Sequence, residues 1–242
     1  MSAAEKVDPR DAITTGLTNA MRRVMPDVSR VTGVRRLSGG ASQETWSFDA
    51  VSGGTAHPLI LRRTPGGGTN SKRDTAVPLA TEAALIQLAE KQNVPVPPVT
   101  LVLDTADGLG DGFVMGRVEG ETIARKILRD AEFADARPKM ARQCGEILAR
   151  IHAVPRDTVP DIQVSPAASE LKKYRDIYTS MKHPHPVFEL AFKYLEDHLP
   201  SDENLTLVHG DFRNGNLMVG PDGVRAVLDW ELAHVGDPME DL

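Results

Sequence analysis

Cysteine is almost absent from the chain: Cys144 is the one cysteine among 242 residues, so no intrachain disulfide can form. No run approaches the roughly eighteen consecutive apolar residues of a membrane-spanning helix, and the N-terminal residues lack the apolar segment of a secretory signal. The seven histidines occur with no His-Glu-x-x-His or Cys-x-x-Cys motif, so nothing indicates a zinc site. These absences predict a cytoplasmic protein that does not enter a membrane.

Charge and composition narrow the class further. The formal net charge is −6 and the pI is near 5.7, whereas a general nucleic-acid binder usually presents a basic face, so we expect no nucleic-acid partner. Hydrophobic residues make up 40% of the chain, enough for a sizeable core in one large domain or in two closely packed lobes. Cys144 recurs with Met140, Ile147 and Ile151 at helical spacing, so we interpret it as a packing residue and not as a nucleophile.

Two aspartates and one asparagine lie close together in a short C-terminal stretch, between apolar, strand-like runs. Asp211 is followed five positions later by Asn216 and thirteen positions after that by Asp229. Transfer of a γ-phosphoryl group consists mainly of orienting the attacking hydroxyl and holding Mg²⁺ against the phosphates. A carboxylate can accept the hydroxyl proton, while an amide oxygen and a second carboxylate can ligate Mg²⁺. We assign these roles to Asp211, Asn216 and Asp229 in that order.

The same stretch carries a family resemblance. His209, Asp211 and Asn216 match the H-x-D-x-x-x-x-N pattern of the protein-kinase catalytic loop. With His-Gly-Asp at 209–211 and Asp-Trp-Glu at 229–231, the chain resembles the aminoglycoside phosphotransferase and choline kinase-like family. Among its members it is most similar to the phosphotransferase-like domains associated with acyl-CoA dehydrogenases. The resemblance implies a kinase-type fold that uses ATP and Mg²⁺.

The order of predicted elements agrees with an α+β, bilobal protein-kinase-like fold. A β-rich N-terminal lobe precedes a mainly helical C-terminal lobe, and we place the nucleotide-binding lobe at 1–117 and the catalytic lobe at 118–242. Periodicity and breaking residues predict strands at 31–37, 44–51, 58–63, 99–104, 112–118 and 205–208. They predict helices at 11–25, 77–91, 137–152, 169–180 and 186–199.

Several nucleotide-binding residues are implied by the resemblance. Gly39 and Gly40, between two predicted strands, could bring backbone N–H groups to phosphate oxygens, although the pair alone would be an ordinary hairpin turn. Arg62 stands at the strand end where the family carries a phosphate-pairing lysine, and its planar fork is not equivalent to an ammonium group. Glu82, on the following helix, is the implied ion-pair partner of Arg62.

The resemblance also implies an adenine site at the end of the strand predicted for 112–118. There Met115 would line the pocket, and the backbones of Gly116 and Val118 would hydrogen-bond the adenine edge. Glu231 and Asp237 are weaker candidates for supporting the metal or attracting a cationic acceptor, and solvated loop carboxylates are the favoured interpretation of both. Because family members continue with further helices, we expect residues 1–242 to be a fragment of a longer protein.

These observations predict an ATP- and Mg²⁺-dependent phosphotransferase acting on a hydroxyl of a small molecule. Arg62 and the early end of the chain motivate an alternative, a nucleotide-binding pseudokinase or regulatory module without efficient transfer. A metal-dependent phosphohydrolase would need further metal ligands. The sequence assigns neither the acceptor nor the oligomeric state, because fold and site chemistry specify the donor and the reaction better than the substrate.

Overall fold

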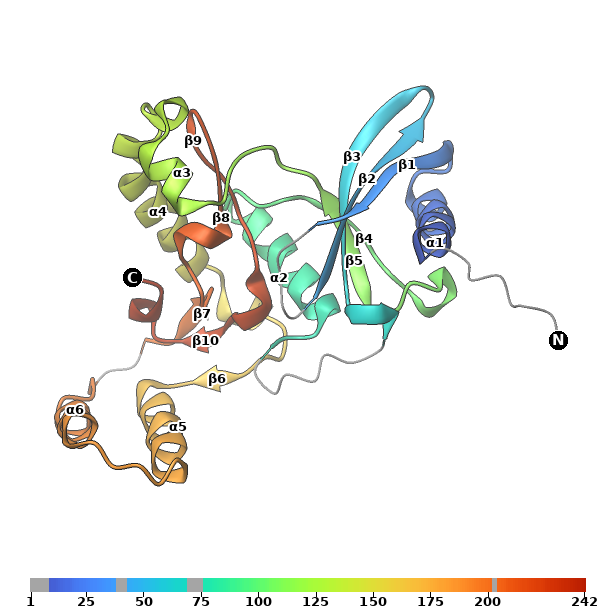
Figure 1. Cartoon of the computed structure of the whole chain (residues 1–242). Helices are drawn as coiled ribbons and strands as arrows, with labels where there is room; N and C mark the ends of the chain where they lie inside the picture. Colours follow the sequence, from blue (N-terminus) through green and yellow to red (C-terminus); the bar gives the residue numbers. More distant parts are fainter. Residues whose placement is uncertain (1–8, 38–42, 69–75, 202–203) are drawn as a thin grey trace.

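The structure is a computed structural model, and it describes residues 9–37, 43–68, 76–201 and 204–242. Its N-terminal part is an antiparallel sheet in the order β1-β2-β3-β5-β4 (Figure 1). The strands are β1 (Val28–Arg36), β2 (Glu44–Ser52), β3 (Thr55–Arg63), β4 (Val99–Val102) and β5 (Gly112–Gly116). β2 and β3 pair without a register shift around Gly53 and Gly54, whose positive φ angles permit the tight turn.

Side-chain alternation along β3 separates a core face from an open face. Helix α1 (Pro9–Val24) covers one side of the sheet, and Leu59 and Leu61 are buried in the core formed with it. Ile60 and Arg62 face the opposite side, because successive strand residues point to opposite faces. The alternation therefore places a charged side chain on the face that looks toward the C-terminal half.

Helix α2 (Leu79–Lys91) lies between the sheet and the C-terminal half (Figure 1). Its apolar residues Leu79, Ala83, Ile86 and Ala89 form a buried stripe, whereas Glu90 and Lys91 are exposed. The stripe belongs to a core that contains Phe113 of β5 and apolar residues of the C-terminal helices and strands. Burial of apolar surface stabilises the folded state by about 25 cal/mol per Å². The packing of α2 against both halves therefore stabilises their arrangement.

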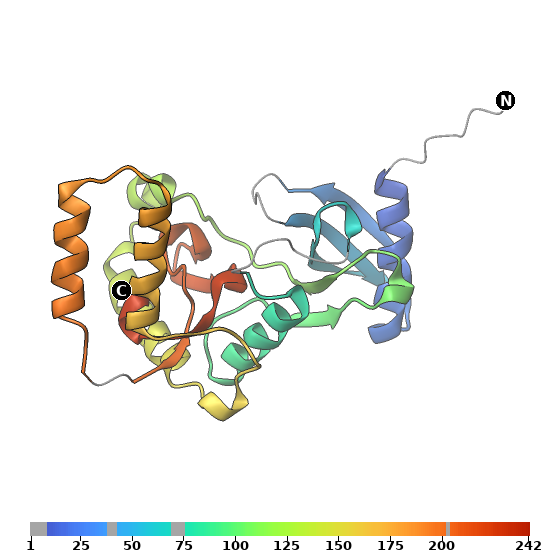
Figure 2. The ribbon, with the colours of Figure 1, turned by 90° about the horizontal axis from the view of Figure 1, so that it is seen from below.

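The C-terminal half begins after β5 and contains most of the longer helices. Its helices are α3 (Ala124–Arg129), α4 (Arg137–His152), α5 (Ala167–Ser180) and α6 (Pro186–Asp197). Its strands are β6 (Val164–Ser165), β7 (Thr206–Val208), β8 (Leu217–Gly220), β9 (Gly223–Val227) and β10 (His234–Gly236), arranged as a β6-β10-β7 sheet and a β8-β9 hairpin. Helices α5 and α6 run side by side and stand off from the rest (Figures 1 and 2).

The predicted fold class is confirmed, with a β-rich N-terminal part and a helical C-terminal part. The chain leaves the five-stranded sheet at Gly116, and we propose the boundary between the lobes there, between residues 117 and 118. Cys144 packs at the edge of the core, and burial raises the pKa of its thiol. Within the described residues, no helix combines the length and the apolar character needed to cross a bilayer.

Candidate active site

A cavity of about 1120 Å³ lies between the open face of the sheet and the C-terminal half. Eight of the predicted site residues line it: Arg62, Glu82, Met115, Gly116, Val118, Asp211, Asn216 and Asp229. Gly39 and Gly40 lie outside the described residues. The cavity therefore joins residues from strands β3 and β5, helix α2 and the loops around β8 and β9, which are far apart in the sequence.

Asp211 lies on the loop between β7 and β8, and two neighbouring side chains orient its carboxylate. The Nε of Arg213 lies 3.1 Å from both carboxylate oxygens. The Nδ2 of Asn216 donates to Oδ2 of Asp211 at 2.8 Å and to its backbone oxygen at 2.9 Å. A carboxylate held by two donors keeps a defined orientation toward a group that approaches from the cavity.

His209 supports this loop from inside the protein. It is completely buried against Trp230, and burial lowers its pKa despite the nearby carboxylates, so the imidazole is neutral at physiological pH. Its Nδ1 accepts from the N–H of Asp211 at 3.3 Å, so the proton is on Nε2, which donates to the carbonyl of Leu228 at 3.0 Å. His209 thereby connects the loop of Asp211 to the strand end that leads into Asp229.

Asn216 and Asp229 are brought together by the backbone. The N–H of Leu228 donates to the backbone oxygen of Asn216 at 2.8 Å, next to the hairpin of β8 and β9. Asp229 adopts a left-handed conformation with φ 66° and ψ 62°, which aspartate tolerates better than most residues. This bend ends the strand and directs the Asp229 carboxylate into the cavity.

Arg62 faces Asp229 from the sheet and is surrounded by acidic and amide groups. Its Nη2 contacts Oδ1 of Asp229 and lies 3.7 Å from Oε2 of Glu231, while its Nε lies 3.3 Å from Oε1 of Glu82 and bonds Oε1 of Gln43. Burial acts to lower the pKa of Arg62, but the three carboxylates outweigh it and raise the pKa. The guanidinium therefore remains charged, in contact with three anions.

Glu82 is the carboxylate of this cluster whose ionised form is least favourable. It is 1% exposed, and among the described residues its Oε2 has no hydrogen-bond partner. Burial raises the pKa of Glu82 to about 7, with Asp229 and Glu231 adding to the rise and Arg62 opposing it. Three carboxylates around one guanidinium leave an excess of negative charge that a bound cation would relieve.

We expect Glu82→Gln to stabilise the ligand-free protein as the pH rises. The Glu82 carboxyl ionises near pH 4.5 in the unfolded chain but only near pH 7 in the folded protein. Across this window Glu82 therefore lowers the free energy of unfolding by on the order of 3 kcal/mol. The melting temperature of the variant should exceed that of the parent by an amount that grows from pH 5 to pH 8. Glu90→Gln, exposed on the same helix, is the control, and an equal difference at every pH would contradict the assignment.

Asp241 is a residue of this site that the sequence did not indicate. Its carboxylate accepts from the backbone N–H groups of His209 and Gly210, both at 2.9 Å, and lies 2.9 Å from Nε2 of His152. Burial would raise the pKa of Asp241, but these hydrogen bonds outweigh it and hold the pKa below its ordinary value. Asp241 thus fixes the start of the loop that carries Asp211.

The structure corrects one sequence prediction, for Glu231, and places two further candidates, Gly116 and Asp237. Glu231 is not a solvated loop carboxylate but is 9% exposed beside Arg62, and Nε2 of Gln43 donates to it at 3.2 Å. The N–H of Gly116 already donates to the carbonyl of Pro98 at 2.9 Å, because the two segments meet closely there, so an adenine contact of Gly116 would have to use its carbonyl. Asp237 lies away from the cavity and caps a C-terminal 3₁₀ turn, accepting from the N–H of Met239 at 2.9 Å.

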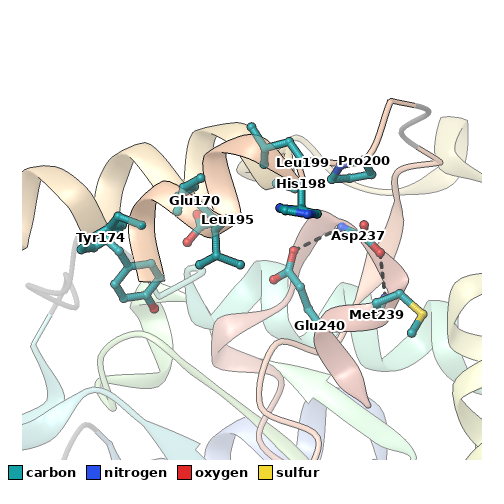
Figure 3. A pocket seen from close by; sticks show the side chains of 12 residues that line it. Glu170, Tyr174, Leu195, His198, Leu199, Pro200, Asp237, Met239 and Glu240 are labelled. Carbon is teal, nitrogen blue, oxygen red and sulfur yellow. Dashed lines mark hydrogen bonds between the residues drawn. The ribbon is translucent and has the colours of Figure 1, made fainter. Parts of the chain in front are cut away.

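Asp237 instead borders a second hollow, of about 550 Å³, between α5, α6 and the C-terminal turn (Figure 3). Its lining is mainly apolar, including Tyr174 and Leu195, and His198 and Glu240 are among its polar residues. Neither Asp211 nor Asp229 belongs to it. Among the described residues, those predicted for phosphoryl transfer therefore line the larger cavity and not this hollow.

The donor set of the larger cavity suits Mg²⁺ held jointly with phosphates. The described residues contain no group of three or more His, Cys, Asp or Glu side chains placed for one metal. Mg²⁺ bound with nucleotide phosphates commonly uses one or two protein carboxylates and water. Because Asn216 directs its amide nitrogen to Asp211, its amide oxygen is the atom suited to a hard cation, together with the Asp229 carboxylate.

Known proteins resemble this chain in sequence and in fold. Acyl-CoA dehydrogenase family member 10 of Mus musculus is 29% identical over 198 residues, which are 76% of this chain and 18% of the relative. The curated relatives that match are much longer, and the chain spans less than a third of each.

Two solved structures show the same fold at low identity. The apoenzyme structure of the macrolide 2′-phosphotransferase MphH of Brachybacterium faecium matches with a TM-score of 0.65 at 20% identity. The match covers 93% of this chain and 74% of the MphH chain. The streptomycin–ATP complex of APH(2″)-IIa has a TM-score of 0.54 at 16% identity and covers 98% and 75%. A sequence model described as the phosphotransferase enzyme family matches residues 33–242, most of the chain, so this protein belongs to that family.

Proposed function

We propose that this chain transfers the γ-phosphoryl group of ATP, with Mg²⁺, to a hydroxyl group of a small molecule. The observation that carries the proposal is the convergence of Asp211, Asn216 and Asp229 on one side of a single cavity, with Arg62 facing them from the sheet. Membership of the phosphotransferase family supports the reaction type. Together they make a cavity with a base, metal ligands and a phosphate-binding cation.

Asp211 is the group we assign to the acceptor hydroxyl. Its carboxylate, held by Arg213 and Asn216, would orient the hydroxyl and accept its proton as the new bond to phosphorus forms. Asn216 and Asp229 would hold Mg²⁺, which neutralises charge on the phosphates when it is bound. Because His209 and Asp241 fix the loop from behind, the carboxylate needs little rearrangement to meet a substrate.

The donor nucleotide would occupy the inner part of the cavity. ATP is present in the APH(2″)-IIa complex, which has the same fold, and this supports ATP as the donor here. Met115 would contact the adenine, and the polar edge of the base would be left to the carbonyl of Gly116 and the backbone of Val118, since the Gly116 N–H is already used. Gly39, Gly40 and Arg62 would meet the phosphates.

One observation favours the alternative of a nucleotide-binding module without efficient transfer. Arg62 contacts the same Asp229 carboxylate that the metal would need, and an arginine at this position is bulkier than the expected lysine. Such a module would bind the nucleotide but transfer no phosphate. The two functions therefore predict the same binding and different turnover.

Calorimetric titration of ATP, with and without Mg²⁺, tests the donor site before any acceptor is known. We expect binding that requires Mg²⁺ and that Asp229→Asn weakens at least about ten-fold, because a metal carboxylate ligand is lost. Asp222→Asn, in the exposed turn between β8 and β9, is the matched control. Absence of ATP binding by a folded protein would refute the proposed function.

A further inference from the structure

Gln43 joins the two halves of the cavity through a single amide group. It is 7% exposed, immediately precedes β2 and lines the larger cavity. Its Oε1 accepts from Nε of Arg62 on the sheet, and its Nε2 donates to Oε2 of Glu231, which belongs to the C-terminal half, at 3.2 Å. A buried amide with both ends satisfied by charged partners has one orientation available.

The Arg62 guanidinium uses its nitrogens for different purposes. Nε faces Gln43 and Glu82, whereas Nη2 faces Asp229 and Glu231. If Asp229 binds a cation, Nη2 has to exchange that carboxylate for another anion, but the contacts of Nε are made by a different nitrogen to different partners and can remain. A lysine ammonium has one nitrogen and could not separate these contacts.

We propose that Gln43 is a positioning residue for phosphoryl transfer: it anchors Arg62 through Nε so that the Nη groups are directed at the nucleotide phosphates. The inference rests on the proposed function and adds a residue to it. A neutral amide suits this role, because it accepts the Nε hydrogen without adding another negative charge next to Glu82, Asp229 and Glu231. It also donates to Glu231, which keeps that carboxylate from taking Nε itself.

The substitutions at Gln43 separate its two bonds. Gln43→Ala removes both, and Gln43→Asn is one methylene too short to span Arg62 and Glu231. Gln43→Glu keeps an acceptor for Arg62 but places a carboxylate against Glu231. We expect Gln43→Ala to weaken ATP binding in the presence of Mg²⁺ about ten- to a hundred-fold, the usual effect of losing a hydrogen bond to a charged group. Gln43→Asn and Gln43→Glu should not restore the affinity, because neither side chain keeps both bonds.

Glu44→Gln is the matched control. Glu44 is the next residue, is 8% exposed and pairs with Arg63 at 2.8 Å, outside the residues that line the cavity. Its substitution should lower the melting temperature and leave the affinity for ATP unchanged. This comparison distinguishes a loss of binding from a general loss of stability, because the two positions are adjacent in the sequence and both are buried.

A double-mutant cycle with Arg62→Lys tests the anchoring directly, using titrations of ATP with Mg²⁺ on the whole chain. Lysine has no Nε to hold, so Gln43→Ala should change ATP affinity less than about three-fold in the Arg62→Lys background. Equal effects in both backgrounds would overturn the inference, as would an affinity within about two-fold of the parent for Gln43→Ala alone. A parent protein that binds no ATP would instead refute the proposed function on which the inference rests.

Discussion

Replacing Asp211 by asparagine should lower kcat about 10²- to 10⁴-fold, the usual contribution of a general base, and leave the affinity for ATP within about two-fold. The amide keeps the size of the side chain but cannot accept the hydroxyl proton. Arg213 and Asn216 donate to Asp211 rather than to the inner part of the cavity, so the nucleotide contacts should persist. The measurement is the rate of label transfer from γ-labelled ATP to an acceptor found by screening.

Asp222→Asn is the control for this experiment, because it makes the same chemical change at an exposed aspartate paired with Arg225. It should transfer label at the parental rate. An Asp211→Asn protein with parental kcat would show that Asp211 is not the base. A parallel loss of kcat and ATP binding would assign Asp211 to the nucleotide site instead.

Replacing Asp241 by alanine should have the largest effect on stability. The carboxylate is fully buried and accepts from His209, Gly210 and His152, so its removal leaves three donors without their acceptor. Breaking a buried network of this kind costs about 3–5 kcal/mol, and for a domain of this size the melting temperature falls roughly 2–4 °C per kcal/mol. Thermal unfolding of the variant and the parent at neutral pH checks this expectation.

The pH dependence of the Asp241 effect provides a second test. The folded-state pKa of Asp241 is depressed below 3.8, so the stability it contributes is present at neutral pH and is lost as the pH falls through the folded-state pKa. The difference between parent and Asp241→Ala should therefore shrink in strong acid. Glu240→Gln, at the partly exposed neighbouring position, should behave like the parent, and a melting temperature unchanged by Asp241→Ala would contradict the role given to Asp241.

The parts of the site that sequence analysis predicts are those whose chemistry and spacing are local. Asp211, Asn216 and Asp229 stand close together in the sequence between strand-like runs, and the structure places them in one cavity. Arg62 and Glu82 could be paired only through the family resemblance, because nothing local links a strand end to a helix twenty residues later. Most elements were predictable because alternation and helical periodicity mark long segments well.

The residues that sequence analysis missed act through tertiary contacts. Asp241 follows His209 by 32 positions, and Gln43 precedes Glu231 by 188, so no periodicity or motif connects either pair. An acidic residue two positions after Asp229 was visible in the sequence, but its burial beside Arg62 was not. Strands β6 and β10 are too short to show alternation and exist because they pair with each other and with β7.

Transfer of the γ-phosphoryl group to a hydroxyl is the central claim, and γ-³²P-labelled ATP tests it most directly. The parent protein and Asp211→Asn would each be incubated with labelled ATP, Mg²⁺ and pools of small hydroxyl compounds, and the products would be separated. The account predicts label in an organic phosphate with the parent and its near absence with the variant. Label found as inorganic phosphate alone, or no transfer by a parent protein that binds ATP, would contradict it.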